Sequence, residues 1–179
     1  MIHHRHAPTS IIALALTSAL VVGCSPAPEP TPTPTAAFAS EEEAFAAAEE
    51  TYRAFTSRLN EVDTSDSTTF EPLFALSSGE FEKADREAYS TMHAEGLIVD
   101  GDTRILSFQG SEAVSPFTVV VADVCLDVRA VTVVDADGAS HVDPDRPDVY
   151  ALSVTFIYDE TQLLIDSAIV NQDFACDEL

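Results

Sequence analysis

Apolar side chains recur at helical spacing in the part of the chain that follows its proline-rich segment. They lie three or four residues apart, so that one side of a helix would carry all of them. These positions are Phe45, Ala48, Tyr52, Phe55, Leu59 and Val62. Ser40 and Glu43 stand before this run at the spacing of a capping box, which predicts that the helix begins just after Ser40. A helix with several aromatic side chains on one side has to pack against a large apolar surface.

Two further helices are predicted between residues 70 and 96. The first is short, follows a polar break over residues 63–69, and carries Phe70, Leu73, Phe74 and Leu76. Ser77 and Glu80 repeat the capping-box spacing and start the other helix, over residues 80–95. We expect the apolar side of that helix to hold Phe81, Ala84, Ala88 and Met92. Gly96 ends it, because glycine tolerates the left-handed conformation of a helix C-terminus, and Leu97 can fold back as in a Schellman ending.

From Leu97 onward the apolar period changes from helical to alternating, which predicts strands. Asp100-Gly101 separates residues 97–99 from residues 103–108 and predicts a hairpin with a type I′ turn. The longest alternating stretch covers residues 117–134 and is far longer than the usual strand of about 5–6 residues, so we expect a bent strand, with a bulge as one source of the bend. Its apolar face is predicted to hold Val120, Ala122, Val124, Leu126, Val128 and Ala130.

The last two predicted strands cover residues 150–158 and 163–170, after a polar connection over residues 135–148. Helices followed by antiparallel strands define the α+β class. About 140 residues are enough to bury the core of one domain. We therefore expect one domain with N-terminal helices packed on a curved antiparallel sheet.

The N-terminus has the features of an export signal. Arg5 precedes an apolar run from Ile11 to Val22, and these 12 residues are too few for a membrane-spanning helix, which needs about 20. The run ends in Val21-Val22-Gly23-Cys24, which resembles the lipobox of bacterial lipoproteins: an aliphatic residue, a small or aliphatic residue, Gly or Ala, then Cys. The resemblance implies cleavage before Cys24 and a diacylglycerol on its thiol. An ordinary secretory signal is the alternative.

The chain is accordingly divided into three parts. Residues 1–23 are the expected signal peptide, residues 24–37 the lipidated cysteine with a Pro/Thr-rich linker, and residues 38–179 the α+β domain. Alternate prolines over residues 25–35 favour an extended polyproline conformation, which would act as a stalk. The expected location is the extracytoplasmic face of the cell membrane, with the membrane as a partner through the lipid on Cys24.

The charge of the chain limits the classes of partner. All 31 acidic residues follow Cys24 and one of the eight basic residues, Arg5, precedes it, so the part from Cys24 onward carries a net charge of −24. Such a surface repels phosphates, which argues against nucleic acid as a partner. It also offers no basic patch for anionic lipid, so membrane attachment would depend on acyl chains. The acidity suits solubility outside the cell or recognition of a basic partner.

Two cysteines remain in the expected domain, Cys125 and Cys176. An even pair in an exported chain predicts a disulfide. The bridge would join the C-terminal tail to the centre of the long strand. A pair of metal-binding thiolates is the alternative, but the sequence offers no second cysteine pair or neighbouring histidines to complete a tetrahedral site.

The order of helices and long strands resembles the nuclear transport factor 2-like fold, also called SnoaL-like or cystatin-like cone. The resemblance is carried by the helices over residues 40–62 and 80–95 and the strands over residues 117–134, 150–158 and 163–170. The chain is also similar to small lipoproteins of high-GC Gram-positive bacteria in three segments: residues 125–128, 133–138 and 145–148. Those lipoproteins imply a shared domain and no activity.

Some cone-fold proteins are isomerases or dehydratases that use Asp, His and Tyr side chains in a pocket between helices and sheet. The corresponding candidates are Tyr52, Tyr89, His93 and either Asp123 or Asp127. Such a site needs an acid and a base that converge on one substrate atom, and the sequence does not place any two together. We therefore expect no enzymatic activity and no cofactor.

Calcium ligands are suggested by the carboxylates of Asp135, Asp137, Asp143 and Asp145, but the ligand positions of an EF-hand loop are absent. A turn and a proline-stiffened loop explain the same residues, so no metal site is expected. The sequence favours a non-catalytic binding or envelope-interaction module, with a protein or cell-wall component as a candidate partner. The alternative is a protein with a small-molecule pocket, either a carrier or a cone-fold isomerase- or dehydratase-like enzyme.

Overall fold

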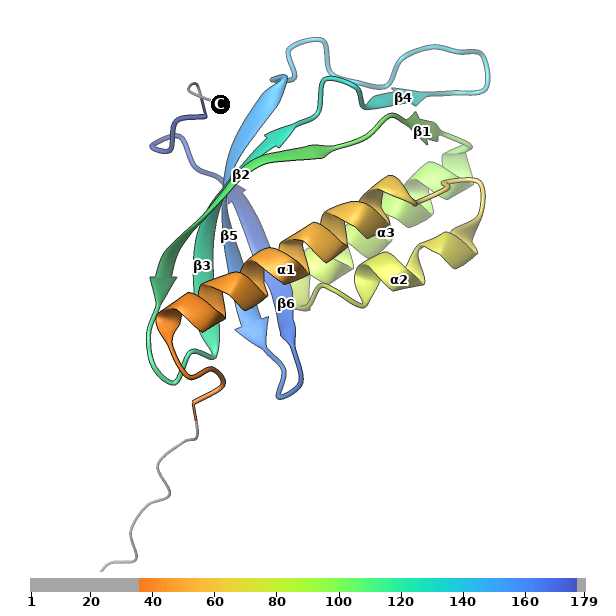
Figure 1. The fold of residues 1–179 in the computed structure, drawn as a ribbon. Coiled ribbons are helices and arrows are strands. Elements are labelled where there is room, and N and C mark those ends of the chain that lie inside the picture. Colours follow the sequence, from red (N-terminus) through yellow and green to blue (C-terminus); the bar gives the residue numbers. More distant parts are fainter. Residues whose placement is uncertain (1–35, 177–179) are drawn as a thin grey trace, which may run out of the picture. The chain divides into compact units, whose positions relative to one another are not determined.

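The computed structural model describes residues 36–176, which form one α+β domain. Three α-helices precede the strands: α1 (Glu41–Asn60), α2 (Glu71–Phe74) and α3 (Gly79–Glu95), with a short 3-10 turn (Ser67–Thr69) before α2. The strands are β1 (Ile98–Asp100), β2 (Arg104–Ala113), β3 (Val119–Asp127), β4 (Thr132–Val134), β5 (Val149–Tyr158) and β6 (Leu163–Val170). The helices pack on one face of a curved antiparallel sheet with strand order β2-β3-β5-β6 (Figure 1).

Helix α1 begins where the capping pattern predicts. The Ser40 hydroxyl accepts a hydrogen bond from the Glu43 amide at 3.2 Å. The Glu43 carboxylate accepts from the Ala39 amide at 2.8 Å, one residue before the position that a standard capping box uses. Ala48, Tyr52 and Phe55 of the predicted stripe are buried against the sheet. The predicted helix and its inward side are therefore confirmed.

The start of α3 differs from the prediction. Ser78, not Ser77, is the N-cap residue, and its hydroxyl contacts Asp166 of β6 at 3.1 Å. The reason is that residues 76–78 run beside β6: the Ser78 amide donates to Ile165 and the Ile165 amide donates to Leu76. The end of α3 is as expected, since Gly96 has a φ of 67° and the Leu97 amide donates to Met92.

The inward side of α3 is also different from the predicted one. Ala84 and Ala88 are exposed, whereas the partly buried positions include Phe81, Asp85 and Tyr89. The two alanines are small, so they constrain the rotation of the helix less than the rings of Phe81 and Tyr89, which pack on the core. One consequence is that Asp85 is turned inward.

Strands β5 and β6 match their predicted ranges closely, and β3 buries the predicted apolar positions Val120, Ala122 and Val124. Alternate residues of β3 therefore face the helices and the opposite face of the sheet. The edge strand β2 contains two register shifts against β3, between Ile105 and Ser107 and between Gly110 and Glu112. Such irregularities bend and twist a strand, which accounts for the curvature around α1.

The predicted hairpin at Asp100-Gly101 is wrong. Strand β1 pairs with β4 (Asp100 opposite Thr132), while β2 pairs with β3 (Arg104 opposite Asp127). Gly101 has a φ of 90° and lies in the break between β1 and β2. Residues 128–131 form the corresponding break between β3 and β4. The expected bend in the 117–134 stretch is therefore present, as a break between β3 and β4. Residues 101 and 130 are in close contact there, so both strand paths leave the main sheet together and form a two-stranded extension.

Candidate functional site

Aromatic side chains fill the space between α1 and the centre of the sheet. The ring of Tyr52 lies 6.3 Å from each of the rings of Phe55, Phe108 and Phe156, measured between centroids. Phe45 packs directly on Gly110 of β2, where an added Cβ would lie only 2.4 Å from the Phe45 ring. The position where a cone fold could hold a pocket under α1 is therefore occupied by the protein's own side chains.

The two candidate tyrosines have structural neighbours. Tyr52 belongs to the aromatic cluster just described, and its burial raises the pKa of its phenol. Tyr89 packs against Phe70 and Phe74, with ring centroids 5.6 and 6.1 Å away. Burial also raises the pKa of Tyr89, with a smaller contribution from the charge of Asp85. Both phenols therefore stay protonated at neutral pH.

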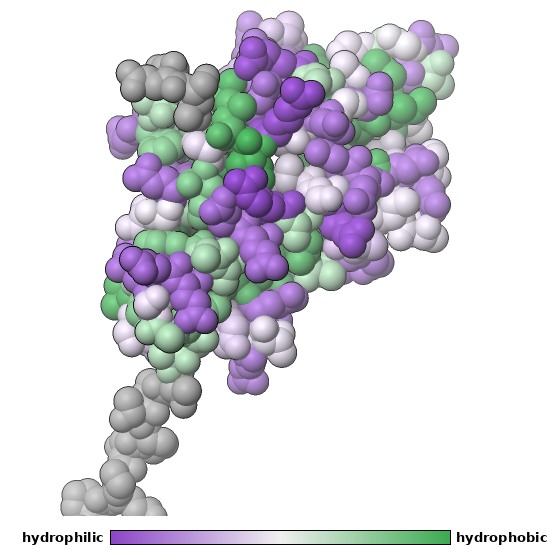
Figure 2. Space-filling view, in the orientation of Figure 1, coloured by the Kyte–Doolittle hydropathy of each residue, from purple (hydrophilic) through white to green (hydrophobic). Residues whose placement is uncertain are grey.

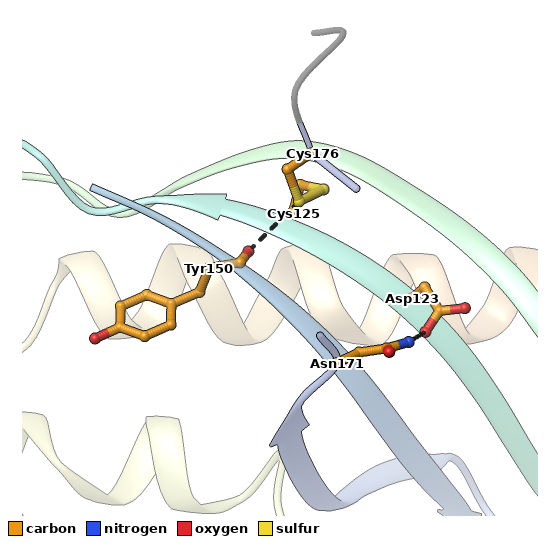
Figure 3. The surroundings of a disulfide bond; sticks show 5 residues. All are labelled: Asp123, Cys125, Tyr150, Asn171 and Cys176. Atoms are coloured by element: carbon orange, nitrogen blue, oxygen red, sulfur yellow. Dashed lines mark hydrogen bonds between the residues drawn. A yellow bond between two sulfur atoms is a disulfide. The ribbon is translucent and has the colours of Figure 1, made fainter. Parts of the chain in front are cut away.

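The remaining acid–base candidates are His93, Asp123 and Asp127. His93 lies near the end of α3, where its Nδ1 is 2.7 Å from the carbonyl oxygen of Thr64. Asp123 lies on the sheet face opposite to Val120, Ala122 and Val124 and accepts a hydrogen bond from the Asn171 amide group (Figure 3). Asp127 accepts hydrogen bonds from the backbone and side chain of Arg129, which lower its pKa. Of these residues, only His93 lies near a candidate tyrosine: it follows Tyr89 by one helical turn, and both rings pack against Phe70, with centroids 6.1 and 5.6 Å away.

Asp85 is an ionisable residue of the interior that was not among the predicted site residues. It lies one helical turn before Tyr89, and its Oδ2 is buried without a hydrogen-bond partner within residues 36–176. Desolvation raises the pKa of its carboxyl to about 6. The sequence holds a signal for it, because Phe81, Asp85 and Tyr89 are spaced by four residues and share one helix face.

The suspected calcium ligands serve their own loop. The Asp135 carboxylate accepts hydrogen bonds from the amides of Asp137 and Ala139, and these lower its pKa. Asp143 accepts from the amide of Asp145 in the same way. These are turn-forming side-chain contacts. Within residues 36–176, no three His, Cys, Asp or Glu side chains are grouped closely enough to hold a metal ion.

An apolar cavity of about 160 Å³ lies between the C-terminal ends of α1 and α3 and the β1–β4 extension. The helices contribute Leu59, Tyr89 and Met92 to its wall, the segment just after α1 contributes Val62, and the extension contributes Val99 and Val133. The side chain of Asn60 fastens this region by two hydrogen bonds to the backbone of Thr103, at 2.9 and 3.0 Å.

A second hollow, of about 240 Å³, adjoins this cavity and shares five of its lining residues. In contrast to the cavity it is polar, and its other walls are Asp63, Asp100 and Asp102. The two hollows together form a site with an apolar part and an acidic part. Tyr89 is the one ionisable side chain in the wall of the apolar cavity, and the ionisable side chains of the hollow are the three aspartates.

The two cysteines of the domain lie at disulfide distance, with sulfurs 1.97 Å apart and Cα atoms 5.8 Å apart. Cys125 is fully buried on β3, and Cys176 lies in the tail that follows β6 (Figure 3). The geometry is compatible with the predicted bridge. Cys24 lies outside the described residues, and none of the helices described has the length and apolar composition needed to cross a membrane.

Comparisons with known proteins establish the fold and no family. No protein-family model and no curated protein matches the chain. Among solved structures, it is similar to the intermembrane space region of the chloroplast protein ARC6, with a TM-score of 0.50 and 14% identity over 70% of this chain and 95% of that one. The protein Aln2 from a Streptomyces species gives a TM-score of 0.45 and 17% identity over 75% and 93% of the two chains. At this identity the ARC6 similarity concerns the fold alone, and the similarity to Aln2 is too distant to add to it.

Proposed function

We propose that the chain is a lipid-anchored protein of the extracytoplasmic face of the cell membrane, and that its α+β domain is a non-catalytic binding module. The lipobox-like residues 21–24, the apolar run before them and the proline-rich stalk support the anchor. The cysteine pair at disulfide distance supports an oxidising location. The helices packed on a curved antiparallel sheet support the resemblance to nuclear transport factor 2-like domains.

The observation that carries the binding role is the aromatic filling beneath α1. Tyr52, Phe55, Phe108 and Phe156 occupy the interior. Of the other candidate acids and bases, Tyr89 and His93 lie one turn apart on α3, whereas Asp123 and Asp127 lie on β3 and are hydrogen-bonded to Asn171 and Arg129. Catalysis by proton transfer needs at least two such groups around one substrate atom. A module that recognises a partner or ligand needs only a surface or a cavity, and the domain has both.

The acidity favours basic or cationic partners. The net charge from Cys24 onward is −24, which disfavours nucleic acid and anionic lipid and attracts positively charged groups. A protein or cell-wall component with basic groups fits this surface. The alternative, a small-molecule pocket, is favoured by one specific observation, the apolar cavity beside Tyr89.

The anchor is tested by Cys24→Ser in a bacterial host that lipidates exported proteins. We expect the variant to lose incorporation of labelled fatty acid and to leave the membrane fraction, because no other segment is proposed to hold the chain there. Ser25→Ala is the matched control, since it alters the neighbouring residue and keeps the thiol. Unchanged membrane retention of Cys24→Ser would disprove the lipid anchor.

A further inference from the structure

We infer that the site formed by the apolar cavity beside Tyr89 and the adjoining acidic hollow binds a small organic cation, whose apolar part enters the cavity and whose ammonium group lies among the aspartates. This inference names a ligand class for the binding role proposed above. It uses only residues of the domain, and it stands whether or not Cys24 carries a lipid.

The size and walls of the cavity select the apolar part of the ligand. Apolar cavities of about 150 Å³ hold a benzene-sized molecule, so a cavity of about 160 Å³ suits one ring or a short alkyl chain. The walls are mostly aliphatic side chains, with the thioether of Met92, the ring of Tyr89 and the polar residues Asn60 and Thr103. A methionine and a tyrosine in the wall suit a planar or aromatic group, because sulfur and ring edges make favourable contacts with such groups.

The adjoining hollow selects the charge of the ligand. Asp63, Asp100 and Asp102 line it. Asp63 accepts hydrogen bonds from the Ser65 amide and hydroxyl, which keeps its carboxylate ionised. Arg58 of the neighbouring helix end is paired with Glu61 at 2.6 Å, so that its charge is already matched. A positive group is therefore favoured beside the cavity, and a negative one is repelled.

Helix and strand ends that are far apart in the sequence form this site. Leu59 comes from the last turn of α1 and Val62 from the segment just after it, Tyr89 and Met92 come from α3, and Val133 comes from β4. Apolar side chains also gather on the surface over β1 and β4 in Figure 2, where Ile98 is 53% exposed. The β1–β4 extension thus closes one side of the cavity with valines.

Met92 offers a specific readout for ligand entry. The chain contains only two methionines, Met1 and Met92, so that a chain labelled with ¹³C at the methionine methyl groups gives at most two methyl signals. The experiment titrates the full chain carrying Cys24→Ser with three probes that share one ring: 2-phenylethylammonium, 2-phenylethanol and phenylacetate. Met92→Leu assigns the signal.

We expect the cation to shift the Met92 signal saturably, the alcohol to bind about fivefold more weakly, and the anion to bind most weakly. Val133→Phe fills the cavity and should abolish the shift. Asp100→Asn with Asp102→Asn should weaken the cation about fivefold and leave the alcohol unchanged, since only the charge is removed. Asp145→Asn with Asp173→Asn is the matched control, because both residues are exposed and neither lines the site.

Two results would overturn the inference: no shift of the Met92 signal with any probe, or binding of the alcohol or the anion as tightly as the cation. Val133→Phe could lose binding because it misfolds. The double variant Asp100→Asn with Asp102→Asn tests the site without that risk, because both residues are exposed. A negative titration would not contradict the proposed lipid anchor, because the anchor is tested separately by membrane fractionation of Cys24→Ser.

Discussion

Asp85 carries a carboxylate on the inward side of α3, one turn after Phe81 and one turn before Tyr89. One of its oxygens is buried and, within residues 36–176, has no hydrogen-bond partner. A buried charge without a partner destabilises the folded state, and the raised pKa of about 6 expresses this. Buried carboxylates are tolerated mainly where they can become neutral, and protonation makes the Asp85 carboxyl neutral.

The sign of the pH dependence follows from that raised pKa. Between an ordinary pKa near 4 and the folded-state value of about 6, the folded chain holds a proton that the unfolded chain has lost. The stability that protonated Asp85 contributes is therefore complete below pH about 4 and is lost as the pH rises through about 6.

Asp85→Asn should remove this pH dependence. We expect it to stabilise the domain by about 1–2 kcal/mol above pH 6, after allowance for the partial exposure of the side chain, and to have little effect at pH 4. Thermal unfolding followed by circular dichroism between pH 4 and 8 measures the difference between the two proteins. The comparison is needed because hydrogen bonds lower the pKa of other carboxyls, such as Asp63 and Asp159, which gives them the opposite slope.

Glu87→Gln is the control for charge, since Glu87 is an exposed carboxylate on the same helix. The substitution removes one negative charge from the surface and leaves the buried carboxyl of Asp85 in place. An equal gain in stability from Glu87→Gln would show that general charge repulsion, and not burial of Asp85, is the cause.

Gly101 determines how the two strand paths leave the main sheet. Its φ of 90° is accessible to glycine and strained for other residues, and a Cβ there would lie 1.9 Å from the carbonyl oxygen of Ala130. Gly96 at the end of α3 also has a positive φ, 67°, but a Cβ there would meet nothing within 4 Å. A comparison of the two positions therefore distinguishes the cost of the left-handed backbone conformation from the cost of a steric clash.

Replacing each of them by alanine should therefore give different losses. Gly96→Ala is expected to destabilise the domain by about 1 kcal/mol, from the left-handed conformation alone. Gly101→Ala should lose about 3 kcal/mol or more, because the backbone of residue 130 has to move as well. Urea unfolding measures both, and hydrogen exchange of the β1 and β4 amides should increase only in Gly101→Ala. Equal losses would show that the contact with Ala130 relaxes freely.

Local periodicity predicted most elements, because burial on one side of a helix or strand repeats along the chain. The ranges of β5 and β6 and the inward side of α1 were predictable on this basis. Pairing between distant segments was not: the Asp100-Gly101 signal fits a hairpin as well as a strand break, and only the presence of β4 distinguishes the two.

The candidate site was less predictable than the fold. Asp85 was missed because Ala84 and Ala88 suggested a different inward side for α3, and the larger rings of Phe81 and Tyr89 determine its rotation. The cavity beside Tyr89 combines residues from α1, α3 and β4, and such a juxtaposition is set by packing of whole elements. The periodicity of a single helix or strand therefore does not predict this cavity.

On the scale of the whole domain, helices cover one face of the sheet, and the C-terminal tail is fastened to the strands at the other. The Asn171 amide donates to Ala151 of β5, its side chain donates to Asp123 of β3, and Cys176 lies at disulfide distance from Cys125. The cysteines are 51 residues apart in the sequence, so the bridge would close a long loop that spans β4, β5 and β6.

Cys176→Ser tests how much that bridge stabilises the domain. Chain-entropy reasoning for a loop of this length gives a loss of about 4 kcal/mol, which corresponds to a fall in Tm of about 10 °C. Cys176 is the residue to replace, because Cys125 is fully buried and its substitution would add a packing defect. Reduction of the wild-type chain should lower its Tm to a similar value and leave Cys176→Ser unchanged. A wild-type chain whose Tm does not respond to reductant, and whose mass shows two free thiols, would contradict both the bridge and the oxidising location that it supports.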